Sequence, residues 1–174
     1  MDNNRLFRTS LFGGNSVAAM AAGLLGVLLT FIRMRLWQFD LAVPVIYWGD
    51  ALYNSVLAKA LTEGTWNYHI ARLGAPFGMD AVDFPSARTL DFALTKILTA
   101  IVHNPFLSVN LYWLLTIAMA GVFAALFFRS LRISHLVSTS FATVFAISPF
   151  VFYRNITHLD FAAVYCSSGC LLGD

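Results

Sequence analysis

The sequence predicts an all-α, polytopic integral membrane protein. Of its 174 residues, 59% are hydrophobic and only 11% are charged, whereas soluble domains carry about 25% charged residues. A soluble fold so poor in charge would be unable to cover its surface with polar groups. The sequence also contains uncharged runs that are long enough to form membrane-spanning helices. Such helices need about 20 predominantly apolar residues.

The first predicted span covers residues 12–32. Its centre, Val17–Ile32, contains no charged residue. A cleaved signal peptide is the alternative, but Arg33 and Arg35 follow at once and no small-residue cleavage site precedes a polar start. We therefore expect an uncleaved helix. Three residues in it are small enough to let a second helix approach closely: Ala22, Gly23 and Gly26.

Residues 33–105 form a predicted outer loop that contains most of the acidic residues. Within it, Asp50 opens a helical pattern that Gly64 is expected to end. The predicted apolar face consists of Leu52, Tyr53, Val56, Leu57, Ala60 and Leu61. The predicted polar face consists of Asn54, Ser55, Lys59 and Glu63.

A stretch rich in glycine and proline, predicted as loop, separates this helix from a second one that begins at Pro85 and Ser86. Its predicted apolar face consists of Leu90, Leu94, Ile97, Leu98, Ile101 and Val102. Charged residues interrupt the pattern, so this amphipathic helix is expected to lie along the membrane interface. Trp37, Trp48 and Trp66, in the same loop, are of the type enriched at such interfaces.

Two further spans are predicted at residues 107–128 and 136–152. The first is uncharged throughout, and Arg129 and Arg132 follow it. The second carries hydroxyl side chains that form hydrogen bonds within or between membrane helices, and Pro149 is expected to mark its end.

A fourth span begins at residue 159 and is cut short at 172, which predicts that the chain is the N-terminal piece of a longer protein. Positive charge sets the orientation of membrane helices. Arg5 and Arg8 precede the first span, and Arg129, Arg132 and His135 follow the second, so both groups are expected in the cytoplasm. Arg33 and Arg35 lie on the opposite side in this scheme.

Asp50 has two interpretations. Asp is among the preferred N-cap residues of helices. The alternative is a carboxylate held at the boundary of water and membrane, where it takes a proton from an acceptor hydroxyl. Hydrogen bonds from the helix N-terminus would stabilise its charge and make it a weaker base, so the two interpretations compete.

Two other pairs are candidate site residues. Asp80 and Asp83, three apart in a loop, supply oxygen ligands that suit a divalent cation or serve as acids, although solvated loop carboxylates are the simpler interpretation. Arg154 and His158 follow a membrane span and are suited to a phosphate, because arginine offers a fork of donors. The alternative for this second pair is an interfacial anchor.

Several function classes are excluded. The formal net charge of +2 and the lack of a basic run give no support for nucleic acid as a partner. Cys166 and Cys170 have no His or Cys at metal-ligand spacing, so no metal centre is predicted from them. Gly-rich phosphate loops and nucleophile elbows are also absent from the sequence.

The stretch G-D-A-L-Y-N-S-V-L-A-K-A-L-T-E-G-T-W, after the first span, resembles the start of GT-C type membrane glycosyltransferases and related bacterial glycan-transfer proteins. The later F-A-I-S-P-F-V-F-Y-R-N-I-T-H-L-D-F-A-A-V-Y is similar to the segment in which an outer Arg or His precedes the next helix. The resemblance covers roughly residues 41–165.

This resemblance implies transfer of a sugar from a polyprenyl-phosphate donor on the outer face of the bacterial inner membrane. It implies Asp50 as the general base or a metal-site carboxylate and Arg154 as a contact to the donor phosphate. In the function that we expect, Asp80 and Asp83 are supporting acids, and His158 binds phosphate together with Arg154. We expect this length of chain alone to be inactive. The alternative function is a non-catalytic translocase or scaffold for lipid-linked glycans, in which the acids would be helix caps and surface charge.

Overall fold

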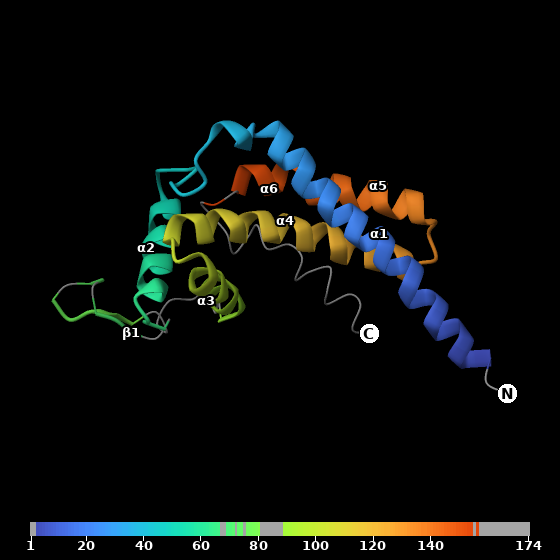
Figure 1. The fold of residues 1–174 in the computed structure, drawn as a ribbon, viewed down its shortest axis with the longest axis horizontal. Coiled ribbons are helices and arrows are strands. Elements are labelled where there is room, and N and C mark those ends of the chain that lie inside the picture. The colour runs from blue at the N-terminus through green and yellow to red at the C-terminus, as the bar shows by residue number, and fades with distance from the viewer. Residues whose placement is uncertain are drawn as a thin grey trace. The chain divides into compact units, whose positions relative to one another are not determined.

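A computed structural model of the chain describes residues 3–66, 69–71, 73–74, 76–80, 89–154 and 156. For residues 3–13 it describes the backbone but not the side chains. The helices are α1 (Asn3–Arg33), α2 (Asp50–Thr62), α3 (Thr89–Val102), α4 (Pro105–Ser130), α5 (His135–Ala146) and α6 (Pro149–Arg154), with a 3-10 turn at Leu36–Gln38 (Figure 1). Strands β1 (His69–Ile70) and β2 (Met79–Asp80) pair in antiparallel fashion. The described chain is thus mostly helical, as predicted.

Three stretches are long and apolar enough to cross a membrane: Gly14–Arg33, Pro105–Ser130 and His135–Arg154. They coincide closely with the three complete spans that the sequence predicts. The fold class, an all-α polytopic membrane protein, is therefore confirmed. The predicted fourth span at residues 159–172 lies outside the described residues.

The helices belong to two compact units. The α1/α5 unit contains residues 3–36 and 114–153, and the α2/α3 unit contains the described residues of 37–113 together with Arg154 and Ile156. Helix α4 contributes its first nine residues to the α2/α3 unit and the rest to the α1/α5 unit. Each unit has its own core.

Small residues form the core of the α1/α5 unit. A Cβ placed on Gly23 of α1 would lie 2.8 Å from the carbonyl oxygen of Ala118 in α4, and one on Gly121 would lie 2.9 Å from that of Ala22. The two backbones are thus in direct contact, as the small residues of the first span predict. The buried cluster around this contact consists of Ala19, Ala22, Ala124, Ala125 and Ala142.

Helices α1 and α5 pack side by side and run in the same direction (Figure 1). At one end, a Cβ on Gly14 would lie 3.0 Å from Cε1 of His135; twelve residues further along α1, a Cβ on Gly26 would lie 3.3 Å from Cβ of Ala146. Arg129 Nε, at the end of α4, donates a hydrogen bond to Oδ1 of Asn15 at 2.8 Å. The start of the first span and the charged turn after α4 therefore lie at the same end of this unit, as the charge pattern predicts.

Hydroxyl side chains of α5 form hydrogen bonds both within the helix and to α1. Thr139 Oγ1 donates to the carbonyl oxygen of Ala18 at 3.4 Å, and Thr143 Oγ1 donates to that of Thr139 at 2.8 Å. Ser138 Oγ donates to the carbonyl oxygen of Ile133 at 3.3 Å. These bonds satisfy the hydroxyl groups where no water competes, which confirms their predicted role.

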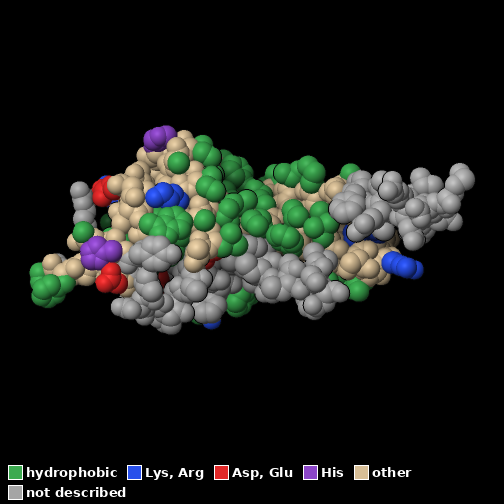
Figure 2. Space-filling model, turned by 90° about the horizontal axis from the view of Figure 1, so that it is seen from below, with side chains coloured by type: hydrophobic (Ala, Val, Ile, Leu, Met, Phe, Trp, Pro, Cys, Tyr) green, Lys and Arg blue, Asp and Glu red, His purple; other side chains and the backbone are tan. Residues whose placement is uncertain are grey.

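The outward faces of the spans are apolar. On α1, Val17, Met20, Leu24 and Leu28 are exposed at helical spacing, opposite the buried Ala18, Ala19 and Ala22. On α5 the exposed side chains include Leu136, Phe141 and Val144. Apolar side chains are widespread on the face in Figure 2, and charged ones form only small, separate spots. Surfaces of this kind are stable in contact with lipid.

One expectation about the third span is wrong. Pro149 does not end a helix but begins one: α5 stops at Ala146, and α6 starts at Pro149. Proline is well tolerated as the first residue of a helix, because its missing N–H would have no partner there. The N–H of Val151 donates to the carbonyl oxygen of Ser148 at 3.0 Å, so the second helix forms directly after the break.

In the α2/α3 unit, the core consists of Leu57, Ala60 and Ile70, against which Tyr53, Leu73 and Phe92 pack. Asn104 caps α4 by accepting a hydrogen bond from the N–H of Leu107 at 2.9 Å. Asn110 Nδ2 donates to the carbonyl oxygens of Leu41 and Val43, each at 2.8 Å. These bonds fix the loop before α2 to the first turns of α4.

Helix α3 keeps an apolar stripe exposed. Of its predicted apolar face, Leu90, Ile97 and Ile101 are exposed, whereas Leu94, Leu98 and Val102 are partly buried. Such an exposed stripe, on a helix that ends two residues before a membrane span, is typical of an interfacial helix.

Candidate functional site

Asp50 is the first residue of α2 and is exposed. The preceding Gly49 has φ 56° and ψ −143°, a conformation that residues with a side chain rarely adopt. Gly49 occupies the N-cap position of α2. The interpretation of Asp50 as the N-cap is therefore wrong: Asp50 is the residue after the cap, in the first turn of the helix, where the helix dipole favours negative charge.

Two aromatic residues stand next to this turn. Tyr47 and Trp48 are 74% and 65% exposed, respectively. Tyr and Trp side chains of this kind settle at the head-group level of a bilayer. Their position two and three residues before Asp50 fits a carboxylate at the boundary of water and membrane.

Asn54, one turn after Asp50 on α2, links this helix to the segment that contains Arg154. Its Nδ2 donates to the carbonyl oxygen of Ile156 at 2.9 Å, across 102 positions of sequence. Arg154 is two residues from Ile156, and both belong to the α2/α3 unit, as does Asp50.

The structure corrects the predicted faces of α2. Asn54 and Ser55, predicted on the polar face, are 6% and 5% exposed, whereas Leu52 and Val56 are exposed. Burial of both polar side chains is possible because each has a hydrogen-bond partner: the carbonyl oxygen of Ile156 for Asn54, and that of Ala51, at 2.8 Å, for Ser55. The exposed Leu52 and Val56 add apolar surface near the candidate site.

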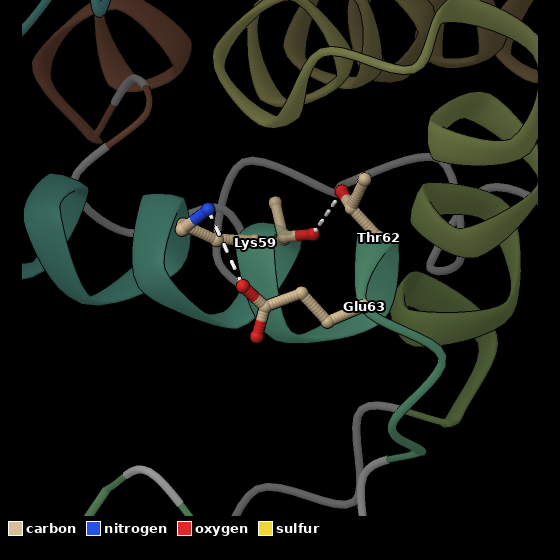
Figure 3. A network of polar contacts seen from close by, with 4 residues as sticks. Lys59, Thr62 and Glu63 are labelled. Carbon is tan, nitrogen blue, oxygen red and sulfur yellow. Dashed lines mark hydrogen bonds and ion pairs between the residues drawn. The ribbon is translucent and has the colours of Figure 1, made fainter.

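The far end of α2 has a separate set of polar contacts (Figure 3). Lys59 Nζ lies 3.3 Å from Oε1 of Glu63, and Thr62 Oγ1 donates to the carbonyl oxygen of Ala58 at 2.8 Å. Gly64, with φ 92°, ends the helix as predicted: its N–H and that of Thr65 donate to the carbonyl oxygens of Leu61 and Ala60. Asp50 and Glu63 are 13 residues apart, or about 20 Å along the helix, so Glu63 is not part of the candidate site.

Asp80 lies in the hairpin and is paired with His69. The two strands place His69 opposite Asp80, and His69 Nδ1 lies 2.7 Å from Oδ1 of Asp80. Both side chains are more than half exposed. The sequence predicts this stretch as loop. The short β pairing replaces that prediction, because Gly74 and Gly78, both with positive φ, let the chain turn back on itself.

The other two predicted site residues, Asp83 and His158, lie outside the described residues. In the part of the chain that is described, no three His, Cys, Asp or Glu side chains are grouped so that they could hold a metal ion. The Asp80–His69 pair alone supplies too few ligands for a cation that prefers six or more oxygen ligands. Of the predicted residues that are described, Asp50 and Arg154 belong to the same unit, in which Asn54 forms a hydrogen bond to Ile156, and Asp80 lies in the hairpin.

Sequence reasoning missed Asn54 and His69. Asn54 has both apolar and polar neighbours in the sequence. Nothing in this local pattern indicates a hydrogen bond to Ile156, 102 residues away. For His69, the glycines at 74 and 78 were the available signal, since positive-φ glycines between two short stretches indicate a turn.

Comparison of the chain with known protein families, with curated proteins and with solved structures finds no match.

Proposed function

We propose that this chain is the N-terminal part of a membrane glycosyltransferase that uses a polyprenyl-phosphate-linked sugar on the outer face of the bacterial inner membrane. The observation that carries the proposal is the hydrogen bond from Asn54 to Ile156. It joins the helix that begins at Asp50 to the segment of Arg154, although the two are a hundred residues apart in sequence. A base and a phosphate contact must act on the same donor and acceptor, so their segments need such a link.

The chemistry assigns one role to each side chain. The Asp50 carboxylate takes the proton of an acceptor hydroxyl while that oxygen forms a bond to the anomeric carbon of the sugar. The bond between this carbon and the phosphate oxygen breaks, and the polyprenyl phosphate leaves with the electron pair. The Arg154 guanidinium stabilises the negative charge of the leaving phosphate. Asp80, and Asp83 as predicted from the sequence, are supporting acids.

The surroundings of Asp50 agree with this role. Its carboxylate is exposed and thus accessible to an acceptor, and the exposed Tyr47, Trp48 and Leu52 offer an apolar surface for a lipid-linked substrate.

The test is Asp50→Asn in the full-length protein. Loss of a general base lowers rates by about 10²- to 10⁴-fold, so we expect sugar transfer to fall by that factor while membrane insertion is unchanged. Glu63→Gln is the matched control, because it neutralises a carboxylate at the other end of the same helix. Full activity of Asp50→Asn would refute the proposed role.

A non-catalytic translocase or scaffold for lipid-linked glycans is the second candidate. It is favoured by the place of Asp50 in the first turn of α2, where a carboxylate also stabilises the helix. Asp50→Ser distinguishes the two candidates. Ser removes the carboxylate and leaves Gly49 at the N-cap of α2, so biological function would survive this substitution in a scaffold and fail in a transferase.

A further inference from the structure

A groove of about 770 Å³ opens on the α1/α5 unit. Its walls come from the last turns of α1 and from the α5–α6 break: the apolar part consists of Leu29, Ile32, Met34, Ile147, Pro149 and Phe152. Arg33 and Tyr153 complete the lining. Near these walls α5 ends at Ala146 and α6 begins at Pro149.

The size and lining of this groove fit a lipid. Pockets that hold small organic molecules measure about 300–1,000 Å³, and this volume lies in that range. The walls belong to two membrane spans, Gly14–Arg33 and His135–Arg154, so hydrocarbon chains and not water surround them.

The one full charge in the lining lies at the end of its span. Arg33 is exposed and is the last residue of α1. Twenty helical residues, from Gly14 to Arg33, extend about 30 Å, which is the thickness of the hydrocarbon layer. Arg33 therefore lies at the level of the lipid head groups, where a guanidinium binds phosphate through two parallel hydrogen bonds.

From the apolar walls and this single cation, we infer that the groove binds an anionic phospholipid of the surrounding bilayer. Its acyl chain lies along Leu29, Ile147 and Phe152, and its phosphate contacts Arg33. Binding of a lipid phosphate would also explain why a positive charge stands at position 33. In the orientation expected from the positive-inside rule, Arg33 is on the outer side, where positive charges are less frequent. The inference does not rest on the proposed transferase function.

The first experiment measures lipid retention by the 174-residue chain in detergent micelles, by native mass spectrometry with added phosphatidylglycerol or phosphatidylcholine. We expect preferential retention of phosphatidylglycerol and a loss of about tenfold in its affinity for Arg33→Gln, the size expected for one charge-assisted hydrogen bond. Arg33→Lys keeps the charge and should recover most of the affinity. Arg35→Gln is the matched control, since Arg35 is two residues away and does not line the groove.

A second pair of variants tests the groove itself. Met34→Trp fills it and should lower retention of phosphatidylglycerol, whereas Met20→Trp, at an exposed position of α1 outside the groove, should not. Equal losses in Arg33→Gln and Arg35→Gln, or equal retention of the two phospholipids, would overturn the inference. So would tight binding of a polyprenyl phosphate without measurable binding of phosphatidylglycerol. Sugar transfer is not measured here, so failure of this inference is distinct from failure of the proposed function.

Discussion

At the scale of single residues, Asn54 joins parts of the α2/α3 unit that are distant in sequence. The side chain is 6% exposed and donates to a carbonyl oxygen of the Arg154 segment. Ile156, which supplies that oxygen, is itself 2% exposed. A buried carbonyl that loses its donor has no water to replace it, so the amide cannot be removed without cost.

We expect Asn54→Leu to lower the free energy of unfolding by about 1–3 kcal/mol, because it leaves a buried carbonyl oxygen unsatisfied. Unfolding in detergent, followed by tryptophan fluorescence, measures this change. Glu63→Gln on the same helix is the control; it removes a largely exposed pair with Lys59 and should cost no more than about 0.5 kcal/mol. Equal effects of the two substitutions would show that the Asn54 bond does not stabilise the unit.

Residue-level prediction from the sequence succeeded where the cause is local. Asp50 begins its helix and Gly64 ends it, because helix termini depend on a few neighbouring residues. The burial of Asn54 and the pairing of His69 with Asp80 depend on partners that only the folded chain brings close. For the same reason the polar face of α2 was predicted incorrectly.

At the scale of helices, contact between α1 and α4 depends on the absence of side chains. A Cβ added to Gly23 or to Gly121 would lie less than 3 Å from a backbone carbonyl oxygen of the other helix. Because lipid is as apolar as the helix surfaces, close van der Waals packing takes the place of the hydrophobic effect in holding such helices together.

Gly23→Val should therefore separate α1 from α4 and lower stability by about 1–3 kcal/mol, the usual cost of overpacking. The thermal unfolding midpoint in detergent measures the effect. Leu24→Val is the matched control: it introduces the same residue at the next position, which is 68% exposed. A midpoint for Gly23→Val equal to that of the control would contradict the direct contact of the two backbones.

Prediction of whole helices from the sequence was accurate wherever an uncharged run had the length of a bilayer. The three spans were predicted within a few residues. The break between α5 and α6 was not, because a proline marks both the end of one helix and the first residue of another. Composition alone does not distinguish these two roles.

At the scale of the whole molecule, the parallel course of α1 and α5 is the feature that bears on topology. Gly14 and Asn15 lie with His135 and Arg129 at one end of the α1/α5 unit. From the positive-inside rule we expect that end in the cytoplasm. On this expectation, the loop between the first two spans, with the hairpin and Asp50, would be on the outer side.

Cysteine labelling in intact cells tests this orientation. With Cys166 and Cys170 replaced by Ser, Phe77→Cys should react with a membrane-impermeant maleimide added outside, because Phe77 is 90% exposed in the outer loop. Leu131→Cys, in the turn after α4 and 57% exposed, should react only after the membrane is permeabilised. The reverse pattern would show that the N-terminus is outside.

Fold class was predictable because low charge and long apolar runs leave few alternatives to a membrane protein. The candidate site was predictable only in part. The position of Asp50 follows from its helix, but the link to the segment of Arg154 depends on a long-range hydrogen bond. From the sequence, Arg33 bears only on topology; its place in the lining of an apolar groove depends on the fold.

The contact of α1 with α4 also constrains how this sequence can vary. Positions 23 and 121 admit only glycine without a shift of the helices, since even a Cβ there would lie less than 3 Å from a backbone carbonyl oxygen of Ala118 or Ala22. The exposed Leu24 and Leu28 need only remain apolar. Relatives that retain this helix pair should therefore be recognisable by the spacing of their small residues, even where charged and aromatic residues have diverged.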